Sequence, residues 1–369
     1  MKTLPILVAA VMTAGALTGN AVARDLNYAT FVPPASGNNT LALQPAFDSI
    51  AKETNGELTF KLFAGGQLLG GKDMLPGLRD GIADAGFVAS SYFVSDLPHA
   101  SIISDMMGFG RDPIAVAGAS LETQLLDCQQ CQQDYADHDV LYLTGHVPTE
   151  YRLLCGGPVA SLKDIHGLRV RGGGPAMART AEAMGTTPIN MSAGDMYEAM
   201  ERGQLDCVVG PIAWLKQYGL HDVVKTVIGE PLGVVGGLGL VVFNQRSWDD
   251  LTADQKHIVL RQMPFITAQA TINGYMKDDQ TVRAKYEGQI KFIDAVPEIR
   301  TELDSINQAS LDLIAKAAME RGVKNPKPIM DTYLANIEKW NRISAEQIKG
   351  DPAKLEQILW DEIFSKLKL

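Results

Sequence analysis

Strand-like and helix-like segments alternate twice along this chain of 369 residues. The first succession begins with "LNYATFV", passes through a helical segment at about residues 40–54 and the strand "ELTFKLFAG", and ends with a short helix and "IADAGFVA". The second begins with "GLRVR" and contains the strands "TPINM" and "DCVVG", each preceded by a helix-like segment. This alternation predicts an α/β fold in which helices cover parallel or mixed sheets. Two such runs, with no polar linker between them, predict two lobes with a cleft between them.

The remaining segments suggest how the chain is divided between the lobes. We expect residues 24–147 to form the first part of lobe I and residues 148–235 the main part of lobe II. Residues 236–369 begin with a crossing strand, "GLGLVVFN", and are then mostly helical, so we expect them to complete both lobes. The helices expected there span residues 253–286, 309–320, 330–342 and 352–366.

The first residues are typical of an export signal. Lys2 precedes an almost wholly apolar or small segment at residues 4–17, and Ala21-Val22-Ala23 has the small-x-small pattern of a cleavage site. The alternative is an uncleaved anchor, but the apolar segment is shorter than the roughly 20 residues of a membrane helix. We therefore expect residues 1–23 to be a signal peptide, cleaved after Ala23, and the mature protein to be soluble and periplasmic.

Charge and motifs exclude several function classes. The formal net charge is −10, which disfavours nucleic acid and anionic membranes as partners. The sequence contains neither GxSxG nor HExxH, and "GGLG" is not a GxGxxG turn that opens a helix. The six histidines show no metal-ligand spacing, and we expect most of them in loops or at the surface. We predict a binding protein without cofactor or metal; an exported enzyme is the remaining alternative.

The cysteines leave their pairing open. Cys128 and Cys131 form a CxxC motif, which could be a structural disulfide, a pair of thiols, a redox pair or half of a metal site. Export favours disulfides, and no second CxxC completes a zinc site. Cys155 and Cys207 lie in separate strand-like runs and could pair only if these strands are neighbours.

Arg171 occupies an unusual position for a cation. It ends the strand "GLRVR" and precedes Gly172-Gly173-Gly174 and a helix that starts at Pro175. Ligands of open α/β sheets bind beyond the carboxyl ends of the strands, where glycines let backbone approach a ligand and a helix N-terminus favours an anion. A guanidinium there suits a carboxylate, which it can hold with two parallel hydrogen bonds. The alternative is a structural salt bridge between the lobes.

The segments around Arg171 resemble a known family in order and spacing. "DIHGLRVR", "MGTTPINM" and "DMYEAMERGQLD" are similar to the signature region of the substrate-binding proteins of tripartite ATP-independent periplasmic (TRAP) transporters, of the C4-dicarboxylate-receptor-like (DctP) type. "TNGELTFKLFAGGQLLGGKDMLPGLRDGIADAGFVASSYF" resembles the first lobe of the same family. The likeness covers most of the chain that follows the signal.

The resemblance implies a function and a fold. Such a protein is a two-lobed periplasmic receptor of the type II-like class, which closes on its ligand and delivers it to a membrane permease. Residues 253–286 would be the long helix that braces both lobes, and Arg171 would pair with the carboxylate of a small organic acid. We expect a monomer. The alternative is a ligand-loaded sensor that presents its closed form to a membrane signalling receptor.

The chain departs from the family pattern at places that bear on ligand choice. Where relatives often have a ligand-contacting asparagine, "DCVVGP" places Gly210, so backbone or the nearby Trp214 could take over that contact. Relatives also carry an arginine about twenty residues before Arg171. Here Tyr151 and Arg152 compete for that position, and strand alternation allows only one of them to enter the cleft. The first lobe would contribute Phe31, Ser90, Ser91 and Tyr92.

Overall fold

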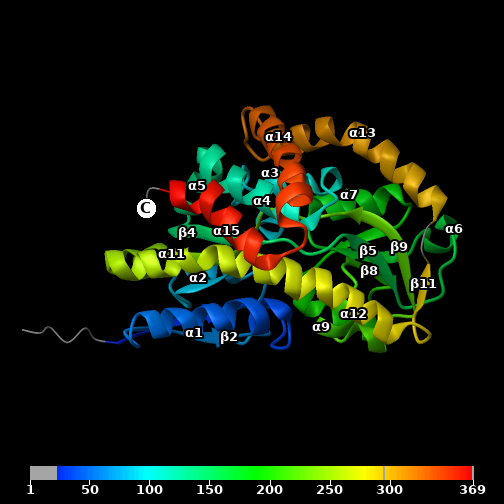
Figure 1. The fold of residues 1–369 in the computed structure, drawn as a ribbon. Helices are drawn as coiled ribbons and strands as arrows, with labels where there is room; N and C mark the ends of the chain where they lie inside the picture. The colour runs from blue at the N-terminus through cyan, green and yellow to red at the C-terminus, as the bar shows by residue number, and fades with distance from the viewer. Residues whose placement is uncertain (1–22, 294–295, 368–369) are drawn as a thin grey trace, which may run out of the picture.

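The computed structural model describes residues 23–293 and 296–367 and shows two lobes joined by a long helix (Figure 1). The predicted signal segment lies outside the described residues, apart from its last residue, Ala23. Each lobe is built on one mixed sheet that helices cover, as the alternation of segments predicts. The predicted two-lobed α/β fold is confirmed.

The sheet of the first lobe has the order β2-β1-β3-β10-β4. Strand β1 lies parallel to both β2 and β3, whereas β10 runs antiparallel between β3 and β4. Every residue of the central strands β3 and β10 is buried, which explains their almost continuous apolar sequences. The strands are β1 (Arg24–Ala29), β2 (Leu58–Phe63), β3 (Ala85–Ala89), β4 (Val140–His146) and β10 (Leu238–Asn244). The helices of this half include α1 (Gln44–Glu53), α2 (Met74–Arg79), α3 (Ser101–Asp105), α4 (Pro113–Glu122) and α5 (Gln129–Ala136).

The sheet of the second lobe has the order β11-β9-β5-β8-β6-β7. Strand β6, which carries Arg171, lies between β7 and β8 and parallel to both, while β5 runs antiparallel to β8 and β9. The strands are β5 (Tyr151–Cys155), β6 (Arg169–Gly172), β7 (Thr187–Asn190), β8 (Cys207–Gly210), β9 (Thr226–Gly233) and β11 (Lys291–Ile293). The helices between them are α6 (Leu162–Ile165), α7 (Pro175–Ala183), α8 (Met196–Glu201) and α9 (Trp214–Gln217).

The chain crosses between the lobes after β4, after β9 and along one continuous helical stretch. This stretch consists of α11 (Ala253–Ala268), the π-helical η7 (Gln269–Met276) and α12 (Lys277–Tyr286), and it runs past both lobes in Figure 1. Helix α11 packs on α1 and β4 of the first lobe. On α12, the carboxylate of Asp279 accepts hydrogen bonds from Thr149 Oγ1 in the crossing segment and from the backbone N–H of Ala213 in the second lobe. The helix expected at residues 253–286 is therefore confirmed as a brace across both lobes.

The C-terminal helices return to both lobes. Helix α13 (Pro297–Glu320) packs on α7. Helix α14 (Lys327–Ile343) packs on α4, and helix α15 (Pro352–Glu362) packs mainly on α11. The prediction that a helix begins at residue 309 was wrong, because α13 already begins at Pro297. Strands β9 and β11 were missed. Strand β9 contains Gly229 and Pro231, which are depleted in strands, and β11 is only three residues long.

Both cysteine pairs form disulfides. Cys128 and Cys131 are joined at the start of α5, and Cys155 and Cys207 are joined across β5 and β8. The second pair forms because the register of these antiparallel strands places Cys155 directly opposite Cys207. Within the described residues no cluster of three His, Cys, Asp or Glu side chains could hold a metal ion. No helix in the same part of the chain combines the length and apolar character needed to cross a membrane.

Candidate functional site

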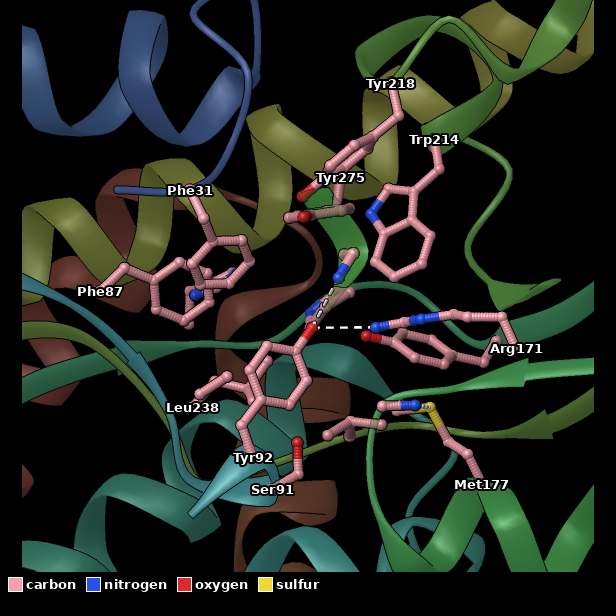
Figure 2. A pocket seen from close by; sticks show the side chains of 17 residues that line it. Phe31, Phe87, Ser91, Tyr92, Arg171, Met177, Trp214, Tyr218, Leu238 and Tyr275 are labelled. Atoms are coloured by element: carbon pink, nitrogen blue, oxygen red, sulfur yellow. Dashed lines mark hydrogen bonds between the residues drawn. The ribbon is translucent and has the colours of Figure 1, made fainter. Parts of the chain in front are cut away.

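A pocket lies between the two lobes, beyond the carboxyl end of β6 (Figure 2). The first lobe supplies one part of its wall, the second lobe another, and the crossing helix supplies Tyr275 from η7. Irregular π-helical turns often occur at functional sites. The lining residues are Phe31, Phe87, Ala89, Ser91, Tyr92, His146, Pro148, Tyr151, Arg171, Gly173, Met177, Ala193, Trp214, Tyr218, Val235, Leu238 and Tyr275.

Arg171 is almost fully buried, with 1% of its surface exposed, yet no carboxylate among the described residues forms an ion pair with it. Its Nε donates a hydrogen bond to the carbonyl oxygen of Met191 at 2.9 Å, and its Nη2 donates to the hydroxyl of Tyr92 at 2.9 Å. Within the described structure Nη1 has no hydrogen-bond partner. A buried guanidinium whose Nη1 has no partner favours an anion beside it, because a buried charge is costly unless it is paired.

Tyr92 connects the lobes at this point. Its hydroxyl accepts the hydrogen bond from Arg171 and another from the backbone N–H of Ala193 at 2.9 Å (Figure 2). Gly173 makes the arrangement possible, since a Cβ atom there would lie 2.7 Å from Arg171 Nη2 and 2.9 Å from Tyr92 Cε1. The lobes therefore meet in a closed arrangement at Arg171.

Aromatic rings form most of the remaining wall. Phe31 and Phe87 stack at a centroid distance of 4.9 Å, and Phe31 also contacts the ring of Tyr92. In the second lobe, Trp214 packs against Tyr151 at 5.5 Å and against Tyr218 at 5.2 Å. The guanidinium carbon of Arg171 lies 5.5 Å from the centroid of the Trp214 ring, a cation–π contact that helps to hold the arginine in place.

The pocket carries one positive charge. Burial lowers the pKa of His146 to about 3, so this lining histidine is neutral at physiological pH. Burial also raises the pKa of Tyr151, Tyr218 and Tyr275 well above the ordinary value, which keeps these hydroxyls neutral. Arg171 is the one charged side chain among the lining residues.

Six of the nine residues expected at the site line this pocket. They are Phe31, Ser91, Tyr92, Tyr151, Arg171 and Trp214. Of the two residues that competed for one position, Tyr151 faces the pocket, whereas Arg152 donates hydrogen bonds to the Gly229 carbonyl oxygen and to Glu150. Ser90 is buried behind the pocket, where its hydroxyl donates to the Gly237 carbonyl oxygen at 2.8 Å.

Gly210 does not line the pocket but makes room for a residue that does. A Cβ atom at Gly210 would lie 2.2 Å from Cε3 of Trp214, so the indole ring occupies the space above this glycine. The structure places the Trp214 ring directly over Gly210. That Trp214 or backbone takes over the contact expected of the family's asparagine stays a prediction.

Two aromatic wall residues were not expected at the site. Phe87 and Tyr275 are both buried in the pocket wall. His146 was an exception to the expectation that histidines lie in loops or at the surface, because it ends β4 and is 2% exposed. Its Nε2 lies 3.1 Å from Asn38 Nδ2, and its ring stacks on Tyr275. The apolar strand "VLYLTGHV" was the available signal that this histidine is buried.

Comparison with known proteins agrees with this architecture. Residues 30–317 match the sequence model of the DctP family, described as bacterial extracellular solute-binding protein, family 7. The chain belongs to this family. The resemblance to TRAP receptors drawn from the motifs around Arg171 is thereby confirmed, and the family consists of substrate-binding receptors.

Individual relatives are distant. The chain is 24% identical over 172 residues to the ectoine-binding periplasmic protein TeaA of Halomonas elongata, a match that spans 46% of this chain and half of that protein. It is 22% identical over 323 residues to a monocarboxylate 2-oxoacid-binding periplasmic protein of Nostoc sp., covering 84% of each chain. A TRAP solute-binding protein from Rhodoferax ferrireducens, solved in complex with copurified benzoate, superposes with a TM-score of 0.75 at 16% identity, covering 87% of this chain and 99% of that chain. This DctP-family protein thus shares the two-lobed fold of a solved receptor.

Proposed function

We propose that this DctP-family protein is a periplasmic receptor that binds a small organic carboxylate between its lobes. The observation that carries the proposal is the free Nη1 of the buried Arg171, which faces no acidic partner among the described residues. A ligand carboxylate would accept a charge-assisted hydrogen bond from Nη1 and lie against the guanidinium. Such a ligand would neutralise a buried charge that the described protein groups leave unpaired.

The arrangement of the pocket supports a receptor that closes on its ligand. Its walls come from both lobes, and Tyr92 of the first lobe meets Arg171 and Ala193 of the second. Separation of the lobes would open the pocket, and closure around the crossing helix would bury the ligand. We propose that the closed monomer delivers its ligand to a TRAP-type membrane permease, after export and cleavage following Ala23. The Nostoc relative's monocarboxylate 2-oxoacids and the benzoate of the Rhodoferax protein support a carboxylate ligand.

Calorimetric titration tests the proposal. The purified protein is titrated with pyruvate, succinate, benzoate and glucuronate, and the tightest ligand is repeated with Arg171→Gln. Removal of one partner of a buried charge pair weakens the binding free energy by about 2–5 kcal/mol. The affinity of the Arg171→Gln variant should therefore fall roughly thirty-fold to several-thousand-fold.

Arg169→Gln is the matched control, because Arg169 lies on the same strand but pairs with Asp206 outside the pocket. It should bind the ligand like the unchanged protein. Equal affinity of the Arg171→Gln variant and the unchanged protein would overturn the assignment of the site. Conversion of the ligand to another compound during the titration would instead reveal an enzyme.

A further inference from the structure

We infer that the interlobe pocket selects an acid with one carboxylate and one aromatic ring. The inference rests on the proposed function and adds the class of ligand. It follows from the charge of the pocket and from the placement of its aromatic rings.

The charge of the wall favours a monoanion. Arg171 is the one charged side chain among the lining residues, and its Nε and Nη2 are already engaged with Met191 and Tyr92. A second carboxylate on the ligand would be buried opposite neutral groups, because His146 and the lining tyrosines carry no positive charge. A ligand ammonium group would likewise find no acidic side chain among the residues of the wall. Burial of an unpaired charge is unfavourable, so dicarboxylates and amino acids should bind weakly.

The aromatic walls favour a flat ring. Figure 2 shows Phe31 and Phe87 on one side of the pocket and Trp214 and Tyr218 on the other, with Arg171 beside them. The first pair belongs to the lobe of β1 and β3, and the second pair belongs to the lobe of β8 and α9. Lobe closure therefore brings aromatic faces toward a ligand from opposite sides. Aromatic pairs gain from offset or edge contacts beyond the burial of apolar area, and a saturated ring cannot make these contacts.

Ranking of ligands on the unchanged protein tests the inference. Benzoate and 3-hydroxybenzoate are titrated alongside cyclohexanecarboxylate, succinate and glucuronate at the same pH and salt concentration. We expect an aromatic acid to bind at least tenfold more tightly than cyclohexanecarboxylate, which has the same charge and a similar size. Succinate and glucuronate should bind more weakly still. Equal or tighter binding of any of these three competitors would overturn the inference.

The outcomes separate this inference from the proposed function. If a non-aromatic acid binds best and needs Arg171, the receptor function stands and the ligand class is wrong. If none of the acids binds, the proposed function fails and the ligand class fails with it.

Two wall variants provide a second test. Phe31→Leu and Trp214→Leu keep apolar side chains but remove aromatic faces, so both should weaken benzoate more than cyclohexanecarboxylate. Phe60→Leu is the matched control, because Phe60 stacks with Phe47 at 4.4 Å outside the pocket. An equal loss for both ligands would mean that the walls supply only apolar contact, which would contradict the inference.

Discussion

The hydroxyl of Tyr92 in the first lobe accepts a hydrogen bond from Arg171 Nη2 in the second lobe at 2.9 Å. The same oxygen accepts from the backbone N–H of Ala193 at 2.9 Å. One phenol therefore orients the guanidinium and joins the lobes. The contact holds Arg171 in place and leaves its Nη1, the atom proposed to bind the ligand carboxylate, without a partner in the described structure.

Tyr92→Phe should weaken ligand binding, because it removes an acceptor from a buried guanidinium while the ring stays against Phe31. A hydrogen bond to a charged group contributes about 1.5–3 kcal/mol, so affinity should fall roughly tenfold to a hundredfold. Calorimetry with the tightest ligand measures the change. Tyr142→Phe is the control, since the hydroxyl of Tyr142 is buried with no partner in the described structure. Equal affinities of the two variants would show that the Tyr92 contact does not hold the site together.

Gly210→Ala should displace the indole ring of Trp214, because the new methyl group would lie 2.2 Å from Cε3. Overpacking of this kind costs about 1–3 kcal/mol of stability. Urea denaturation should show this loss, and affinity for the ligand should fall as well. Gly157→Ala is the control, because a Cβ atom there meets no atom within 4 Å. In a Trp214→Leu background, Gly210→Ala should reduce stability much less. An equal loss of stability in that background would show that the new methyl group does not act through Trp214.

The stability of the protein should decrease as the pH falls below about 6.5, in part because of His146. Burial lowers the pKa of this residue to about 3 in the folded protein. At a pH between about 3 and 6.5 the folded protein therefore keeps the ring neutral, whereas the unfolded chain binds a proton there. Between pH 7.5 and 5 this difference destabilises the fold by about 2 kcal/mol. Urea denaturation of the protein and of His146→Gln at both pH values isolates the contribution. The variant should lose less stability over this interval, and parallel losses would contradict the assignment.

Asp105→Asn should destabilise the contact between the lobes at a second place. Its carboxylate, on α3, lies 2.9 Å from Arg321 Nη2 and 3.9 Å from Arg179 Nη2, and only 1% of the side chain is exposed. Removal of a buried charge that faces two guanidinium groups costs about 3–5 kcal/mol. Urea denaturation measures the loss, and Asp331→Asn, in an exposed pair with Lys327, should change little. An equally small loss of stability for Asp105→Asn would show that water takes the place of the carboxylate beside the two guanidinium groups.

Removal of the disulfide between β5 and β8 should cost more stability than removal of the CxxC disulfide. Cys155 and Cys207 are 52 residues apart, whereas Cys128 and Cys131 are three residues apart, so the first bond constrains the unfolded chain much more. The chain-entropy relation gives about 4 kcal/mol for the long loop and less than half of that for the short one. Thermal unfolding of the two double-alanine variants compares them, and the opposite order would mean that native contacts outweigh the loop entropy.

The sequence by itself determined the features that depend on local pattern. Alternating segments gave the two α/β lobes, and the position of Arg171 at a strand end beside glycines pointed to an anion site. Strand alternation required Tyr151 and Arg152 to face opposite sides, as they do. The resemblance to a known family then identified Arg171 as the residue expected to bind the ligand carboxylate. These inferences depend on neighbours along the chain, whose relative directions follow from backbone geometry.

Only the tertiary structure decided which distant residues meet. It placed His146 and Tyr275 in the same wall, showed that Gly210 makes room for Trp214, and set Cys155 opposite Cys207. It also revealed that Nη1 of Arg171 has no partner among the described residues. The physical reason is that strand register, helix packing and lobe closure bring together groups separated by many residues. Periodicity along the chain does not indicate the distances between residues that are far apart in the sequence. The choice of ligand depends on these distances.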